Sequence, residues 1–64
     1  MKFSLSDPAR VRRFDNATDA LAACPPNNAD GNTYAAIYSG REDTWVVGKY
    51  EGDNLMGYLE SDNA

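Results

Sequence analysis

Because its 64 residues contain no histidine, the candidates for catalytic chemistry in this sequence are its carboxylates and one thiol. The acidic pairs Glu42 with Asp43 and Glu51 with Asp53 have the functional groups for general acid–base catalysis. Such catalysis needs a carboxyl group whose pKa is shifted inside a cleft, whereas both pairs fall at expected hairpin tips, in contact with water. We therefore predict no catalytic residues and no enzymatic activity.

The single thiol and one aspartate-rich turn are the other candidates for chemistry. Cys24 lies on the apolar stripe of an expected helix, near its C-terminal end and without a histidine as base, so we interpret it as a small core residue. The run Asp30-Gly-Asn32 matches the start of a calcium loop, but the later ligands and the closing glutamate of an EF-hand are missing. An Asx turn accounts for it. We predict no metal site and no cofactor.

The elements that position these residues are best defined in the second half of the chain. Segments rich in aromatic and β-branched residues, each bounded by Gly, Asp, Asn or Ser, predict three antiparallel strands at residues 33–39, 44–50 and 55–60. Between the last two, Gly52-Asp53 fits a type II′ turn, because glycine accepts the positive φ of its first position. This turn pairs Tyr50 with Leu55, and by extension Gly48 with Gly57 and Val46 with Leu59.

The period of two along these strands sorts their residues onto two faces. The first expected face is mostly aliphatic: Ala35, Ile37, Val46, Gly48, Tyr50, Leu55, Gly57 and Leu59. The second is aromatic and amphipathic: Tyr34, Ala36, Tyr38, Trp45, Val47, Lys49, Met56, Tyr58 and Glu60. Since adjacent glycines leave room for another backbone, we expect the helix to pack on the first face.

The first half of the chain is expected to supply one helix and a short strand. Residues 2–6 alternate in polarity, which predicts a strand. Residues 8–14 fit either a strand after a turn or a short helix with proline at its first position. Residues 15–24 predict a helix capped by Asp15 or Asn16 and stopped by the two prolines that follow, and residues 25–32 a loop. The expected fold is a single α+β domain, residues 1–64, with a βαβββ-like order and the helix on a three-stranded meander.

The charge of the chain is acidic and uneven. The formal net charge is −4 and the isoelectric point about 4.4. Residues 1–29 hold four basic and three acidic side chains, a balance of +1, whereas residues 30–64 hold two and seven, a balance of −5. This balance argues against binding to nucleic acids or anionic membranes. The single cysteine and the lack of a hydrophobic N-terminal run predict a cytoplasmic location.

The aromatic face and the acidic hairpin tips are the expected binding surface, because aromatic residues and methionine are enriched at interface cores. The N-terminal segment covering this face, or weak homodimerisation through it, are the alternatives. The residues predicted to contact a protein partner are Tyr34, Tyr38, Glu42, Asp43, Trp45, Glu51, Asp53, Met56, Tyr58 and Glu60. The acidic charge predicts a partner with a basic surface of the kind that binds nucleic acids.

In size, acidity and βαβββ-like architecture, the chain resembles small inhibitors encoded by phages and mobile elements, among them anti-CRISPR proteins and other DNA mimics. The resemblance extends over the whole chain and rests on these properties rather than on a sequence motif. It implies a viral protein in the host cytoplasm that binds a CRISPR effector complex and blocks its target-DNA binding. The alternatives are a host-takeover or antitoxin-like inhibitor of a host enzyme, and a small homo-oligomeric accessory protein.

Overall fold

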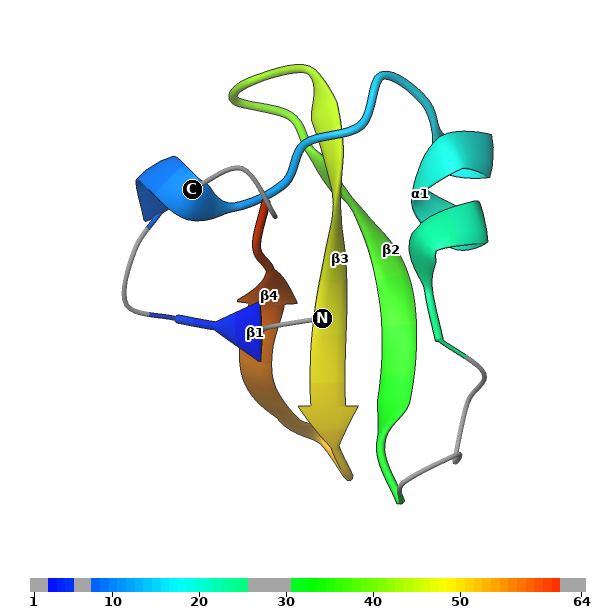
Figure 1. The fold of residues 1–64 in the computed structure, drawn as a ribbon, viewed down its shortest axis with the longest axis vertical. Helices are drawn as coiled ribbons and strands as arrows, with labels where there is room; N and C mark the ends of the chain where they lie inside the picture. Colours follow the sequence, from blue (N-terminus) through cyan, green and yellow to red (C-terminus); the bar gives the residue numbers. More distant parts are fainter. Residues whose placement is uncertain (1–2, 6–7, 26–30, 62–64) are drawn as a thin grey trace.

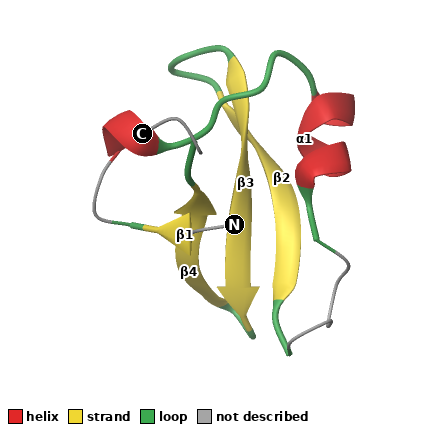
Figure 2. Ribbon diagram, viewed as in Figure 1, coloured by secondary structure: helices red, strands yellow, loops and turns green. Residues whose placement is uncertain are grey.

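A four-stranded antiparallel sheet in the order β1-β4-β3-β2 is the frame of the computed structural model, which describes residues 3–5, 8–25 and 31–61 (Figure 1). Its elements are β1 (Phe3–Ser4), the 3-10 helix η1 (Pro8–Arg10), α1 (Ala17–Ala23), β2 (Thr33–Ser39), β3 (Thr44–Glu51) and β4 (Asn54–Leu59). One short α-helix accompanies the sheet (Figure 2). The predicted α+β class with a single domain is confirmed.

β2 and β3 pair without interruption, from Thr33 opposite Tyr50 to Ser39 opposite Thr44. The loop between them ends at Asp43, whose φ of 55° is the only positive value for a non-glycine among the described residues. In the tighter turn from β3 to β4, Gly52 has a φ of 62°. Glycine therefore stands where a type II′ turn requires it.

A β-bulge in the β3–β4 pair changes the predicted faces. Tyr50 lies opposite Leu55 as expected, but Lys49 lies opposite Gly57 and Gly48 opposite Tyr58, so Met56 is the extra residue. The predicted pairs of Gly48 with Gly57 and of Val46 with Leu59 are wrong. A bulge moves every later side chain of its strand to the other face of the sheet.

Helix α1 packs on the side of the sheet that bears Ala36 and Val47, which we call the helix side. Its inward residue Ala20 and the strand residue Val47 are both fully buried, and with Phe14 and Leu59 they form the core. The expectation that the helix packs on the aliphatic face is wrong. The bulge places Leu59 beside Val47, which concentrates the large buried aliphatic side chains on the helix side.

The cap of α1 is Asn16, with Asp15 outside the helix. The backbone N–H of Asp19 donates to the Asn16 side chain at 2.8 Å, and the Asn16 amide donates to the Asp19 carboxylate at 3.2 Å. The first of these bonds satisfies one of the backbone N–H groups that the first turn leaves unpaired, and the second orients the Asn16 side chain. At its other end the helix stops at Ala23, before Cys24 and Pro25, and is shorter than the expected 15–24.

Residues 8–14 combine the two forms that the sequence allowed. Pro8–Arg10 is the 3-10 helix η1, and the following residues are extended, with isolated bridges from Val11 to Glu60 and from Phe14 to Trp45. This segment therefore joins β4 at one point and β3 at another before it enters α1 (Figure 1). Through it, Phe14 reaches the core.

β1 completes the sheet by crossing Gly57. A Cβ on Gly57 would lie 2.7 Å from the backbone nitrogen of Ser4, so only glycine allows this approach. The Phe3 ring thereby reaches across the helix side to Tyr34 on β2, with 5.4 Å between ring centroids. The Lys49 ammonium lies 5.8 Å from the Phe3 centroid. Of the predicted strand 2–6, residues 2 and 6 lie outside the described residues, as does Asp30 of the expected loop 25–32.

Candidate protein-binding surface

Most of the predicted aromatic surface is used for packing on the helix side. Tyr34 lies against Phe3, and Trp45 packs against the core, with its ring centroid 5.4 Å from that of Tyr38. Trp45 also exchanges two backbone hydrogen bonds with Phe14, at 2.8 and 2.9 Å. Tyr34 and Trp45 are therefore covered by the N-terminal segment and α1, which is one of the alternatives for the aromatic face.

The other side of the sheet, which we call the opposite face, has Gly48 at its centre. A Cβ on Gly48 would meet the side-chain ends of Ile37, Leu55 and Tyr50 at 2.8 to 3.3 Å. These three side chains of the sheet itself therefore close over the glycine. No described α-helix lies on this face.

A groove of about 310 Å³ lies on the opposite face, toward the β2–β3 loop. Its lining comes from the sheet and from the N-terminal segment: Leu5, Val11, Arg13, Ile37, Tyr38, Ser39, Glu42, Val46 and Tyr58. Leu5 and Tyr38 are 57% and 50% exposed, which is high for large hydrophobic side chains. Exposed apolar groups around a hollow are typical of a surface that binds another protein.

An ion pair spans the rim of this groove. The Arg13 Nε donates to the Glu42 carboxylate at 2.9 Å, and the Arg13 Nη1 donates to the carbonyl oxygen of Val11 at 3.0 Å. The pair joins the N-terminal segment to the β2–β3 loop. Since both side chains are solvent-exposed, the pair orients the rim and adds little to stability.

The second carboxylate of the β2–β3 loop holds Tyr38. The Tyr38 hydroxyl donates to the Asp43 carboxylate at 2.7 Å. This hydrogen bond, together with the negative charge of Asp43, raises the pKa of Tyr38 above its ordinary value of 10.0. The Tyr38 ring, which packs against Trp45, thus has its orientation fixed by an acidic group of the β2–β3 loop.

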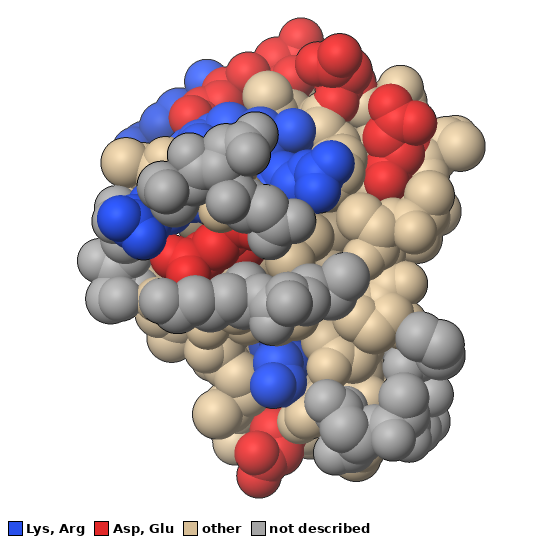
Figure 3. All heavy atoms as spheres, in the orientation of Figure 1, with Lys and Arg blue, Asp and Glu red and all other residues tan. Residues whose placement is uncertain are grey.

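A second acidic site lies at the far end of the sheet. Glu51 and Asp53 are exposed at the β3–β4 turn, and Met56 at the bulge is 46% exposed. Figure 3 shows acidic side chains over both ends of the sheet, with basic side chains interleaved near the upper end. The first and last of the eight residues of β3 are separated by about 23 Å, at roughly 3.3 Å per residue step.

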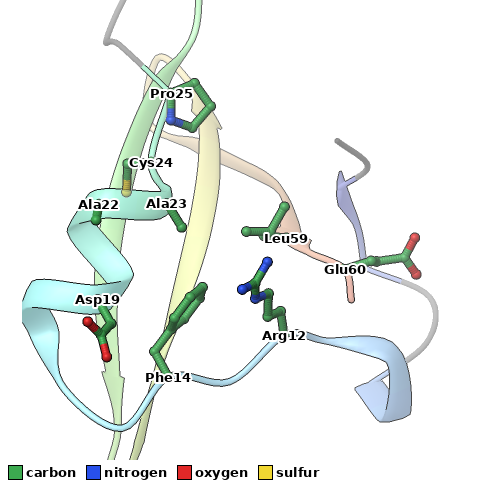
Figure 4. A pocket seen from close by; sticks show the side chains of 9 residues that line it. All are labelled: Arg12, Phe14, Asp19, Ala22, Ala23, Cys24, Pro25, Leu59 and Glu60. Carbon is green, nitrogen blue, oxygen red and sulfur yellow. The ribbon is translucent and has the colours of Figure 1, made fainter. Parts of the chain in front are cut away.

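A larger hollow, of about 670 Å³, lies beside α1 on the helix side (Figure 4). Phe14, Leu59 and the small residues Ala22, Ala23 and Cys24 line it, and the Arg12 side chain extends over it. The Arg12 guanidinium carbon lies 5.1 Å from the Phe14 ring centroid.

The surroundings of the Cys24 thiol, which lies beside this hollow, indicate a packing role rather than a reactive one. It donates to the carbonyl oxygen of Ala20 at 3.5 Å, and its partial burial raises the pKa of Cys24. A raised pKa lowers the fraction of thiolate, which is the reactive form.

The structure divides the ten residues predicted to contact a partner. Tyr38, Glu42 and Asp43 come together at one end of the sheet, and Glu51, Asp53 and Met56 at the other. Tyr34 and Trp45 pack on the helix side, while Tyr58 lies on the opposite face and lines the groove. Glu60 is buried, with 6% of its surface exposed.

Sequence reasoning missed the groove residues Leu5, Val11 and Arg13, because they reach the sheet from a distant part of the chain. The alternation of Phe3 and Leu5 was the only local sign that this segment joins the sheet. Arg13 belongs to the basic cluster Arg10, Arg12 and Arg13, for which the sequence allows a solvated face or an intramolecular counterweight to the acidic meander. The ion pair of Arg13 with Glu42 is of the second kind.

Nothing in the described part of the chain resembles a metal centre, since it contains no cluster of three or more His, Cys, Asp or Glu side chains close enough to share an ion. None of the described helices has the length and apolar character needed to cross a membrane. The chain matches no protein-family model, no curated protein and no solved structure.

Proposed function

We propose that this protein is a non-catalytic inhibitor that binds another protein at a basic, nucleic-acid-binding surface. The observation that supports it is the groove of the opposite face, which the exposed Leu5 lines together with Glu42 of the acidic β2–β3 loop. Apolar groups supply contact area, while the acidic groups favour a partner rich in lysine and arginine.

The acidic ends of the sheet explain how such binding excludes nucleic acid. Carboxylates that pair with the Lys and Arg side chains of a DNA channel take the positions of phosphates there. The resemblance in size and charge to anti-CRISPR proteins makes CRISPR effector complexes the first partners to test. A phage origin and a location in the host cytoplasm belong to the same proposal.

The test is a target-DNA binding assay with a panel of purified type I effector complexes. We expect the protein to reduce DNA binding by at least one complex, and the effect to weaken as salt concentration rises. The absence of inhibition across the panel would rule out the anti-CRISPR proposal. A partner captured without any loss of DNA binding would instead favour a host-takeover or antitoxin-like inhibitor.

Two sets of variants locate the binding surface. Glu51→Lys with Asp53→Lys reverses the charge of one acidic end without touching the core, and we expect weaker inhibition with a flatter salt dependence. Leu5→Ser replaces an exposed apolar groove residue by a polar one and is matched by Leu5→Met, which keeps the position apolar. Inhibition should fall for Leu5→Ser and persist for Leu5→Met; equal effects would place the contact elsewhere.

A further inference from the structure

β2 is an edge strand of the sheet that lacks the charges, the proline and the bulge by which many proteins protect such edges. It is seven residues long, Thr33-Tyr-Ala-Ala-Ile-Tyr-Ser39, and lies at the end of the strand order. It contains no charged residue and no proline, and its pairing with β3 shows no bulge. Natural edge strands usually carry such features because an unprotected edge pairs with another strand.

The hydrogen bonds of Trp45 show which backbone groups of β2 point out of the sheet. Trp45 uses both its N–H and its carbonyl oxygen on Phe14, on the side away from β2. In an antiparallel ladder the residue opposite, Tyr38, therefore directs its own groups outward, and alternation gives Ala36 the same direction. No described residue donates to or accepts from these outward groups of Ala36 and Tyr38.

An exposed leucine lies next to this edge. Asp19, Ala22 and Ala23 face the hollow on one flank of α1, and at 3.6 residues per turn Leu21 falls on the other flank. Figure 1 shows α1 lying on the side of β2 that is away from β3. Leu21, 60% exposed, thus lies above the position that a strand added to β2 would occupy.

We propose that the protein forms a two-fold symmetric dimer in which β2 pairs antiparallel with β2 of a second copy. With Ile37 opposite the second copy's Ile37, the outward groups of Ala36 and Tyr38 in each chain find partners in the other. The two sheets become one continuous sheet. Leu21 then packs over the second copy's Tyr38, which lies beside Ala36, and both exposed side chains are buried.

Charge favours a second copy in this register despite the net charge of −4 on each chain. The strand contributes no charges to the interface. Antiparallel pairing about Ile37 places Glu42 of the acidic loop near the second copy's uncharged Asn32, away from the same loop of that copy. Such a self-complementary contact closes on itself and makes a dimer without further growth.

The experiment measures the protein alone and is independent of the proposed inhibition. Sedimentation equilibrium over a wide concentration range should show a monomer–dimer equilibrium. Leu21→Lys should weaken the dimer by at least about tenfold, because each copy loses a buried leucine. Met56→Lys, a matched change of an exposed side chain on β4, should leave it unchanged. A monomer at all concentrations, or equal weakening by both variants, would overturn the proposal.

Residue-resolved amide hydrogen exchange tests the pairing itself. The amides of Ala36 and Tyr38 should exchange rapidly in dilute protein and become protected as the dimer forms, whereas the Ile37 amide, which points to β3, should be protected throughout. If the dimer forms and the Ala36 and Tyr38 amides stay unprotected, the copies meet through another surface and the β2 pairing is wrong.

Discussion

The two sides of the sheet fill the space above them in different ways. On the helix side, Val47 and Leu59 are covered by α1 and by Phe14 of the N-terminal segment. On the opposite face, Gly48 is covered by Ile37, Leu55 and Tyr50 of the sheet itself. The first arrangement depends on distant parts of the chain and holds the fold together, whereas the second leaves a groove at the surface. The residues that stabilise the fold and those of the proposed binding surface thus lie largely on different faces.

The largest expected effect on this comparison comes from Trp45→Ala. Trp45 packs on the core and against Tyr38, so its loss should reduce the free energy of unfolding by about 3–5 kcal/mol. In a chain of this size that is most of the total stability. Urea unfolding followed by circular dichroism measures it, with Met56→Ala as the control. A small effect would mean that the helix side is not the core.

Neighbouring valines on β3 compare the two faces directly. Val47 is fully buried under α1 and Val46 is 8% exposed on the opposite face. We expect Val47→Ala to cost about 2–3 kcal/mol and Val46→Ala about half of that, because Val46 borders a groove that water can enter. Chemical denaturation of both variants gives the order, and the reverse order would contradict the assignment of the faces.

Gly57 on the helix side and Gly48 on the opposite face allow a second comparison of the two faces. Gly57→Ala forces the β1 backbone away from β4 and should cost about 1–3 kcal/mol, with loss of the contact between Phe3 and Tyr34. At Gly48 a new methyl group meets the ends of side chains that can rotate, so Gly48→Ala should cost less. Denaturation supplies the energies, and nuclear Overhauser effects between the two rings report the contact.

A smaller effect is expected where α1 begins. Asn16→Ala removes the cap acceptor and should cost about 1 kcal/mol. Asp15→Ala, one residue earlier, should stay within about 0.5 kcal/mol. Thermal unfolding of the two variants separates them, and equal losses would place the cap at Asp15.

The smallest expected effect is a pH dependence at the rim of the groove. Because the pKa of Tyr38 is raised in the folded protein, its contribution to stability is complete below the ordinary value of 10.0 and is lost as pH rises through the raised value. Asp43→Gly removes the carboxylate and accepts the local φ of 55° without strain. Titration of the tyrosine ring carbons by NMR should show the Tyr38 pKa fall toward its ordinary value in this variant.

Local patterns in the sequence were sufficient to predict the α+β class, three strands of the meander and the glycine turn at Gly52. They were insufficient for the faces, because a bulge at Met56 adds one residue without changing the types of residue around it. Both faces of the meander are apolar enough to accept a helix, so hydrophobicity alone did not choose between them.

The candidate site shows the same division between local and distant information. Exposure of Glu51 and Asp53 follows from their place in a turn, which the sequence specifies. The burial of Glu60 and the groove around Leu5 depend on the N-terminal segment reaching β4 and the residue after it; Val11 and Glu60, for example, are 49 residues apart along the chain. Contacts of this kind leave no periodic trace in the sequence.

The position of β4 also has a consequence for how the protein is made. β4 is the last of the described strands in sequence order, yet it lies inside the sheet between β1 and β3. During synthesis β1 therefore cannot pair with β4 until the residues up to Leu59 have left the ribosome. Folding should follow release of this segment rather than proceed stepwise, and such long-range pairing makes for slow folding. A ribosome-bound chain that ends before β4 should remain sensitive to protease.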